Sequence, residues 1–371
     1  MKKLKRVLFL QTVFSEKQLE KSKAISPAAN LWQYNFLKEI QMQNIKVLCL
    51  GSIFEPIWPK GKMLIKTSKK DFVNDFVYKK FDYINLPFFK DIYLFLVYFL
   101  YLKNFSFKKG DLIITYNKSF LSKVVYFIHL IKKISWICIV ADLNYPKKAS
   151  GYVYLSWNYF KKIKNVQKKL FIDGGVYNFL NSNKNTKKKK KIILYSGTIG
   201  ESGTSDGYAG LSYLLAAFSK LKNQNINLWI CGKGKSNELT TLLKEDKRIK
   251  FYGFVKEKKL ISLCKFADIF VNPRPSKINE YNFPSKILFY LNFNKPIISN
   301  KIGLSPKYNN VLFLLKNEKI ETLKKEIERV LLLDSNKLKK IKKKIINFKH
   351  QNSWKIQIQK FIKWVNSEIS L

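Results

Sequence analysis

Residues 272–299 read NPRPSKINEYNFPSKILFYLNFNKPIIS, a polar loop followed by a second apolar-periodic segment. This stretch begins where an apolar run ends, which is typical of a buried strand that runs into a loop. Pro284 suits the first position of a helix, where its missing N–H costs nothing, so the apolar-periodic residues after it are expected to be helical. The backbone N–H groups of Ser285 and Lys286 would then point out of the helix start, where the helix dipole stabilises an anion.

The charged residues of this stretch predict which anion would bind. Arg274 and Lys286 add positive charge around the helix start, as in phosphate sites. Glu280 is the one carboxylate within residues 272–299. A carboxylate is unfavourable beside phosphate unless it has another task, such as accepting hydrogen bonds from hydroxyl groups. Groups that donate hydrogen bonds to phosphate, beside a carboxylate that accepts hydrogen bonds from hydroxyls, describe a site for a sugar attached to a diphosphate.

Composition bounds the function. The chain has 371 residues, enough for two domains, and 46% of them are hydrophobic, enough for packed cores. Its formal net charge of +45 suggests nucleic acid or an anionic membrane as a binding partner. Only four of the 70 basic residues are arginine, which recognises bases and phosphates better than lysine does. The abundant Lys, Ile, Asn, Phe and Tyr share AT-rich codons, so nucleic acid is not the expected partner. The excess charge still favours an anionic membrane surface.

Cysteine usage and apolar runs predict a cytoplasmic protein. Cys49, Cys138, Cys231 and Cys264 are dispersed in apolar runs, and no C-x-x-C pair indicates a zinc site or a disulfide framework. The first residues, MKKLKRVLFLQ, hold too few apolar residues for a signal peptide. The longest apolar run, residues 92–102, has 11 residues where a membrane span needs about 20, so it is expected to form a buried or interfacial helix.

Strand-like apolar runs alternate with helical patterns along the chain, which predicts an α/β fold with parallel sheets covered on both faces. Residues 181–191, NSNKNTKKKKK, are polar and self-repelling, and they mark a linker between two similar halves. Ligands of such sheets bind in a cleft at the carboxyl ends of the strands. The expected helices include 30–43, 210–223, 284–293 and a basic segment from 336 to 371. The expected strands are 6–11, 45–51, 111–117, 135–143, 168–175, 191–200, 226–234, 249–255, 267–273 and 295–300.

Glycines gather after one of these strands. Five of the chain's 15 glycines fall within residues 197–210. Such a loop lets backbone N–H groups approach phosphates, but a flexible surface loop explains the pattern equally well. Gly232 and Gly234, in ICGKG, are by themselves more typical of a tight turn.

The order of these parts resembles the C-terminal half of GT-B glycosyltransferases of group 1, also called family 4. The matching segments within residues 192–300 are YSGTIG, LLAAF, ICGKG, FYGFV, ADIFVNPRPS, EYNFPSK and NKPIIS. In the first half, SPAANLWQYNFLKEI (26–40) looks like the family's first loop and helix, and FIDGGV (171–176) like the turn before its interdomain linker.

The resemblance implies two Rossmann-like domains that face each other across a cleft. Residues 1–180 would form the acceptor-side domain, 181–191 the linker and 192–335 the nucleotide-sugar domain. The helical segment 336–371 could pack back on the first domain.

The resemblance also implies roles for individual residues. Glu280 would be the catalytic residue and contact donor-sugar hydroxyls, while Ser285 and Lys286 would contact the diphosphate. Gly232 and Gly234 would lie near the nucleotide base. The full set of implied donor-binding residues is Gly197, Thr198, Gly200, Gly232, Gly234, Phe254, Val255, Lys256, Arg274, Phe283, Ser285 and Lys286. On the acceptor side the candidates are Ser26, Asn30, Asn117 and Asp142; for the last two, ligand contact and plain capping fit equally well.

Two positions depart from the family's pattern. Many relatives carry a second glutamate in the helix, in F-P-S-K-I-x-E-Y-L, where it holds the ribose; here Phe289 stands at that position. Many also carry an Arg and a Lys in the glycine loop, whereas GTIGESGTSDGYAG has no basic residue. Lys256, Arg274 or Lys286 would then supply the positive charge. Because no D-x-D motif is present, neither a metal ion nor a cofactor is expected.

Residues and resemblance together predict a retaining hexosyltransferase that uses a nucleoside-diphosphate sugar as donor. The acceptor would be a polyprenyl-linked or surface glycan in polysaccharide biosynthesis. The protein would attach peripherally to the inner face of the cell membrane through the apolar runs 92–102 and 124–131 and their lysine neighbours. Two alternatives stay open: a non-catalytic glycan- or nucleic-acid-binding protein on a GT-B scaffold, and a nucleotide-sugar epimerase.

Overall fold

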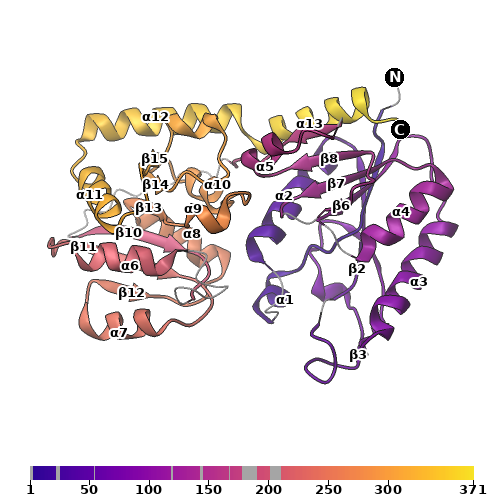
Figure 1. The fold of residues 1–371 in the computed structure, drawn as a ribbon, viewed down its shortest axis with the longest axis horizontal. Coiled ribbons are helices and arrows are strands. Elements are labelled where there is room, and N and C mark those ends of the chain that lie inside the picture. Colours follow the sequence, from indigo (N-terminus) through magenta and orange to yellow (C-terminus); the bar gives the residue numbers. More distant parts are fainter. Residues whose placement is uncertain are drawn as a thin grey trace. The chain divides into compact units, whose positions relative to one another are not determined.

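The computed structural model describes residues 3–21, 26–53, 55–117, 120–142, 145–166, 168–177, 190–200 and 210–371. The chain divides into two compact units (Figure 1). Unit 1 comprises Met1–Leu155, Phe160–Gly174 and Trp354–Leu371, and unit 2 comprises Ser156–Tyr159 and Gly175–Ser353. Most of the predicted linker, residues 181–189, lies outside the described residues, as do Gly203 and Gly207 of the glycine segment.

Unit 1 is built on a seven-stranded parallel sheet in the order β4-β2-β1-β6-β7-β8-β9. Its middle strands are apolar and buried along their whole length, as strands covered on both faces must be. The strands are β1 (Arg6–Phe9), β2 (Lys46–Gly51), β4 (Val77–Lys80), β6 (Asp111–Tyr116), β7 (Trp136–Val140), β8 (Gly151–Tyr154) and β9 (Lys169–Phe171); β3 (Leu64–Ile65) and β5 (Tyr83–Ile84) form a separate antiparallel ribbon.

Two pairs of helices cover this sheet (Figure 1). Helices α3 (Phe89–Asn104) and α4 (Phe120–Lys132) pack on the face that carries Leu8 and Ile113. Helix α2 (Pro27–Met42) packs against α13 (Trp354–Glu368), where the rings of Phe36 and Phe361 lie 5.1 Å apart. The last helix of the chain is therefore part of the core of unit 1. The short helices are α1 (Glu16–Lys21), α5 (Trp157–Lys162) and a 3₁₀ turn at Lys69–Asp71.

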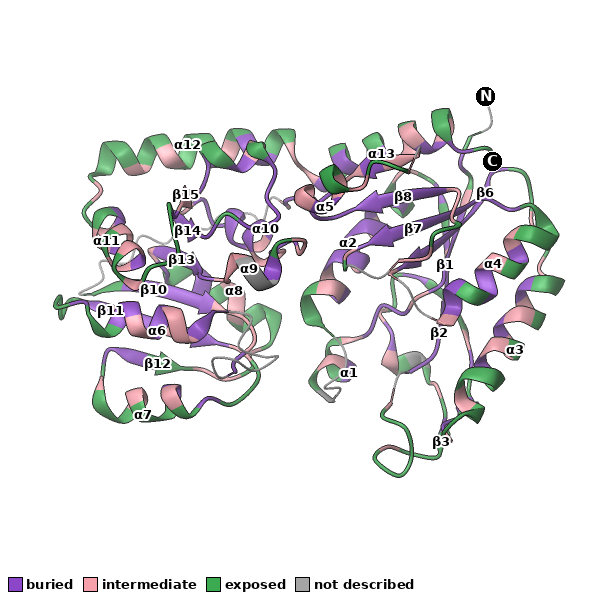
Figure 2. Ribbon diagram, viewed as in Figure 1, coloured by how far each residue is buried: buried purple, intermediate pink, exposed green. Residues whose placement is uncertain are grey.

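Unit 2 has a six-stranded parallel sheet in the order β12-β11-β10-β13-β14-β15. Figure 2 shows its central strands buried between helices. The strands are β10 (Lys191–Ser196), β11 (Ile226–Cys231), β12 (Ile249–Phe251), β13 (Ile269–Asn272), β14 (Ile297–Ser299) and β15 (Phe313–Leu314). The helices are α6 (Leu211–Ser219), α7 (Asn237–Glu245), α8 (Glu257–Phe266), α9 (Ser276–Asn279), α10 (Lys286–Leu291), α11 (Ile320–Leu331) and α12 (Ser335–Gln351), with a 3₁₀ helix at Pro306–Asn310.

The predicted α/β class with two parallel sheets is confirmed. Each of the ten predicted strands is present, and most end earlier because the residues that follow turn into loops. The predicted helix 284–293 is also shorter, since α10 covers only Lys286–Leu291. The sequence interpretation missed five short strands, which are β3, β4, β5, β8 and β15. The terminal segment 336–371 forms two helices rather than one, because α12 ends at its C-cap Asn352.

Candidate functional site

The candidate site of unit 2 lies where β10, β11 and β12 end, at one edge of the parallel sheet. The loops after these strands are joined by main-chain hydrogen bonds. The N–H of Gly197 donates to the carbonyl of Cys231 at 2.9 Å, and that of Ile199 to the carbonyl of Lys233 at 2.9 Å. The N–H of Gly232 donates to the carbonyl of Gly253 at 2.9 Å. The loops therefore form one continuous floor.

Close packing of these loops explains Gly232 and Gly234. A Cβ atom on Gly232 would lie 1.8 Å from the carbonyl oxygen of Gly197, and one on Gly234 would lie 1.9 Å from that of Ile199. Gly234 also has a φ of +131°, which other residues rarely adopt. Both glycines are needed by the backbone itself, so a nucleotide is not required to account for them.

Lys286 has an unusual environment on this floor. Its Nζ is buried and has no hydrogen-bond partner among the described residues, although the residue as a whole is partly exposed. The amine lies 4.5 Å from the centre of the Tyr195 ring. A Cβ atom on Gly197 would lie 2.5 Å from it. Burial lowers the pKa of Lys286 well below its ordinary value, and the nearby charge of Arg274 lowers it further.

Tyr290 positions this lysine. It lies one turn after Lys286 on the same side of α10. Its hydroxyl accepts a hydrogen bond from the N–H of Ser196 at 2.8 Å and lies 3.0 Å from the Ser196 hydroxyl. Its ring stacks on Phe270 of β13 at 4.4 Å. Tyr290 thus fixes α10 to the end of β10 and directs Lys286 toward Gly197. The sequence interpretation missed this role, because a tyrosine in an apolar helix looks like any core residue.

The start of α10 differs from the expectation in one respect. The N–H of Ser285 donates to the carbonyl of Phe283 at 3.0 Å, so it does not point out of the helix start, and that prediction is wrong. The reason is the tight turn at Phe283–Pro284, which folds back on itself before the helix begins. The ring of Phe283 is buried and lies 6.1 Å from that of Tyr308. Contact of Ser285 or Phe283 with a donor stays a prediction.

Glu280 lies at the end of α9, and it is exposed. Its carbonyl accepts a hydrogen bond from the side-chain amide of Asn158 at 3.1 Å, and the neighbouring Tyr281 packs on Tyr159 with 5.6 Å between ring centres. Residues 156–159 belong to unit 2, so a short segment from the middle of the chain supports the Glu280 loop. The Glu280 carboxylate itself is left in a position accessible to solvent, and its catalytic role stays a prediction.

Arg274 lies next to the end of the glycine segment. A Cβ atom on Gly210 would be 2.2 Å from the carbonyl oxygen of Pro273, and Gly210 has a φ of +78°. The carbonyl of Arg274 accepts a hydrogen bond from the Asn300 side chain at 2.9 Å. A second carboxylate, Glu318, accepts a hydrogen bond from the N–H of Ser276 at 2.6 Å. The sequence interpretation missed Glu318, which follows β15 and has no motif around it.

The remaining donor-side candidates follow the same strands. The carbonyl of Thr198 accepts a hydrogen bond from the Tyr195 hydroxyl at 3.0 Å, and Gly200 is buried. After β12, Phe254 is 41% exposed, Val255 follows it, and Lys256 is the N-cap of α8. These residues share the carboxyl edge of the sheet with Lys286, and nothing in the described contacts assigns them a ligand.

In unit 1 the structure brings two acceptor-side candidates together. The side-chain amide of Asn117 donates to the carboxylate of Asp142 at 2.6 Å, and its oxygen accepts from the N–H groups of Ala141 and Asp142 at 2.7 and 3.2 Å. Ser26 caps α2 by accepting from the N–H of Ala29 at 3.4 Å. Asn30 is buried, with both polar atoms bonded to the main chain of Phe14. Contact of these four with an acceptor stays a prediction.

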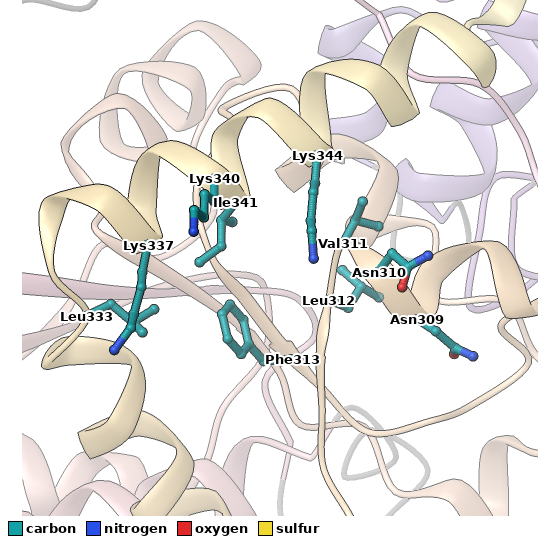
Figure 3. A pocket seen from close by; sticks show the side chains of 10 residues that line it. All are labelled: Asn309, Asn310, Val311, Leu312, Phe313, Leu333, Lys337, Lys340, Ile341 and Lys344. Atoms are coloured by element: carbon teal, nitrogen blue, oxygen red, sulfur yellow. The ribbon is translucent and has the colours of Figure 1, made fainter.

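A separate cavity of about 320 Å³ lies beneath α12 (Figure 3). Lys337, Lys340 and Lys344 point from the helix toward apolar lining residues that include Leu312 and Phe313. None of the predicted site residues lines it.

Two further observations limit the chemistry of the described part of the chain. Burial raises the pKa of the Cys231 thiol to about 12, which keeps this cysteine at the end of β11 neutral and a poor nucleophile. No cluster of three or more His, Cys, Asp or Glu side chains able to hold a metal ion occurs among the residues that the structure describes.

Comparisons with known proteins give one family match, in the second half of the chain. The family model for glycosyl transferases group 1 matches residues 178–348. A comparison with curated protein sequences gives no match.

Solved structures of similar fold extend over almost the whole chain. A glycosyltransferase from Rickettsia africae is 15% identical with a TM-score of 0.72, over 98% of each chain. The Anabaena protein HepE in complex with UDP-glucose is 14% identical with a TM-score of 0.66, over 98% of this chain and 100% of that one. The lipopolysaccharide outer core galactosyltransferase WaaB is 13% identical with a TM-score of 0.66, over 98% and 100%. The fold is therefore GT-B, as predicted.

Proposed function

We propose that this protein is a glycosyltransferase that takes a hexose-type sugar from a nucleoside-diphosphate donor bound in unit 2. The observation that carries the proposal is the buried amine of Lys286, which has no hydrogen-bond partner among the described residues and lies beside Gly197. Burying a cationic group without a hydrogen-bond partner is unfavourable, because the group loses its water and the contact with the Tyr195 ring replaces only part of that hydration. A diphosphate oxygen at this point would supply the missing partner.

The chemistry follows from this placement. With Lys286 bonded to the diphosphate and Arg274 next to it, negative charge that develops on the leaving nucleotide would be stabilised. Glu280 would accept hydrogen bonds from sugar hydroxyls and orient the donor. In line with the resemblance, we propose retention at the anomeric carbon and no metal ion, with the two cations in place of a divalent one. The complex of the similar protein HepE with UDP-glucose supports a nucleotide sugar as donor.

We further propose that the acceptor is a hydroxyl of a growing glycan carried on a polyprenyl lipid or on the cell surface, in polysaccharide biosynthesis. The name of WaaB, a lipopolysaccharide outer core galactosyltransferase of the same fold, supports this class of acceptor. Such an acceptor would place the enzyme at the inner face of the cell membrane. No helix in the described ranges combines the length and apolar character needed to cross a bilayer.

One observation favours a binding protein without turnover as the second candidate. Phe289 stands where many relatives hold the ribose with a glutamate, and its ring packs on Phe293 with 5.4 Å between ring centres. A phenylalanine cannot accept a ribose hydrogen bond. The donor would then bind more weakly, or its ribose would be held elsewhere.

Hydrolysis of nucleotide sugars in the absence of acceptor distinguishes the two candidates. We expect slow release of nucleoside diphosphate from one of a panel of UDP-, GDP- and ADP-sugars, and loss of this release in Lys286→Ala. Lys301→Ala, at an exposed lysine of unit 2, is the matched control. Calorimetric binding of a nucleotide sugar without release from any member of the panel would favour the binding protein.

A further inference from the structure

Helix α3 is apolar on both of its sides. Leu94, Tyr98 and Leu102 face the core and are fully buried. The outer side carries Phe89, Ile92, Tyr93, Leu96 and Leu100, which are 67%, 60%, 40%, 51% and 53% exposed. At about 100° per residue these five side chains fall within one arc of about 100°. A helix on the surface of a soluble protein ordinarily shows polar residues there.

Helix α4 continues this surface. Phe127, Leu130 and Ile131 are 46%, 54% and 55% exposed and also share one side of their helix. The two helices pack against each other, with the rings of Phe95 and Phe127 5.9 Å apart in an edge-to-face arrangement. Figure 2 shows exposed residues along the outer sides of both helices. We call the eight outward-facing side chains of α3 and α4 the α3–α4 face.

The charge around the α3–α4 face is almost all positive. Lys103, Lys123, Lys132 and Lys133 lie on or directly after the two helices and are exposed. Residues 88–133 contain only two carboxylates. Of these, Asp111 is buried against Arg6, which leaves Asp91 as the exposed one. These lysines would repel a second copy of a chain with a formal charge of +45, whereas they would attract acidic lipid headgroups.

We infer that the α3–α4 face inserts into the surface of an anionic bilayer, with its apolar side chains among the acyl chains and its lysines at the phosphates. Helix α3 has 16 residues and would lie along about 24 Å of membrane surface. Amphipathic helices bind in this way, with apolar side chains about 5–10 Å below the headgroups. The inference rests on the proposed membrane-borne acceptor for its purpose, but not on the donor site.

Vesicle flotation tests this inference with a double variant on the α3–α4 face and a single control variant on unit 2. The wild type should float with vesicles of phosphatidylcholine and phosphatidylglycerol, and much less with phosphatidylcholine alone. The double variant Leu96→Glu/Leu100→Glu should bind anionic vesicles at least about tenfold more weakly, because charged side chains would have to enter the acyl region. Leu332→Glu, at an 84% exposed leucine of unit 2, should bind like the wild type.

Two further readouts make the outcome unambiguous. Circular dichroism melting should show that the double variant is folded, since both leucines are more than half exposed. Sedimentation without vesicles tests for a protein partner: self-association that the double variant abolishes would assign the face to a second copy and overturn the inference. Equal flotation of the wild type and the double variant, or equal binding to both kinds of vesicle, would also overturn it. If flotation behaves as expected but the wild type hydrolyses no nucleotide sugar, only the proposed function fails.

Discussion

The amine of Lys286 ends so close to Gly197 that a methyl group on that glycine would lie 2.5 Å from it. This relationship joins the first residue of α10 to the first residue after β10. It gives Gly197 a physical reason to be glycine, since any side chain would occupy the place of the amine. It also makes the charge of Lys286 available at the floor of the loops, where Arg274 is the nearby cation.

Replacing Lys286 should raise stability and remove nucleotide binding at the same time. The pKa of Lys286 is lowered in the folded chain, so the unfolded chain binds the proton more tightly. The wild type therefore loses stability relative to Lys286→Met as the pH falls from about 10.5, and the difference is full below the folded-state pKa. We expect Lys286→Met to be more stable by about 1–3 kcal/mol near pH 7 without ligand.

Thermal melting across pH 7 to 10, with and without nucleoside diphosphate, measures both the gain in stability and the loss of nucleotide binding. Nucleotide should raise the Tm of the wild type and leave that of Lys286→Met almost unchanged. Lys301→Met serves as the control for removing an exposed lysine. A variant that melts below the wild type at pH 7, or that nucleotide stabilises as well as the wild type, would refute the role of the buried amine.

Alanine at Gly197 and at Gly232 should have different consequences. At Gly197 the new methyl group meets the end of the flexible Lys286 side chain at 2.5 Å and the hydroxyl of the buried Tyr195 at 2.9 Å. We expect the amine to be displaced and nucleotide affinity to fall, with a smaller loss of stability than at Gly232. At Gly232 the new methyl group meets the Gly197 carbonyl at 1.8 Å, which cannot move without breaking the floor. We expect Gly232→Ala to lose about 1–3 kcal/mol or more of stability. Urea unfolding and calorimetry on both variants would separate the two effects; equal loss of stability in both would contradict this account.

Glu280→Ala should lower transfer below about a tenth of the wild-type rate without affecting the fold. A tenth corresponds to about 1.4 kcal/mol of transition-state stabilisation, a small contribution for a group that orients the donor sugar. The carboxylate is exposed and its backbone carbonyl, not its side chain, is bonded to Asn158, so stability should be unchanged. Glu245→Ala, at an exposed glutamate at the end of α7, is the control. Activity above a tenth would remove Glu280 from the catalytic assignment.

Nucleotide binding should not depend on a divalent metal. In the proposed site, Lys286 and Arg274 would provide the positive charge that a metal ion would otherwise supply. We expect the same dissociation constant in EDTA and in Mg²⁺ by calorimetry. Phe289→Glu should leave ribonucleotide binding unchanged or strengthen it, since a carboxylate could accept the ribose hydrogen bonds. Loss of binding in EDTA would place the diphosphate on a metal site and move the site away from Lys286.

The sequence was sufficient for the class of fold and for the residues that meet at the carboxyl edge of the unit 2 sheet. Near-continuous apolar runs separated by helical patterns predict buried parallel strands, and strands of this kind place 197–200, 232–234 and 274 at one edge. The sequence could not assign Tyr290 or Glu318, because each acts through a partner distant in the chain, Ser196 and Ser276 respectively. It also could not show that the Ser285 N–H is used within its own turn, since local propensity does not reveal which carbonyl lies near.

The place of the last helix has a consequence for how the protein is made. Trp354 and Phe361 pack against Trp32 and Phe36, so residues at the two ends of the chain share the core of unit 1. A ribosome releases the chain from its first residue to its last, and domains generally fold once their residues have emerged. The residues of unit 2, which end at Ser353, are all synthesised before α13 exists. Unit 1, which holds the earlier residues of the two units, is therefore completed only after all of unit 2 has been synthesised.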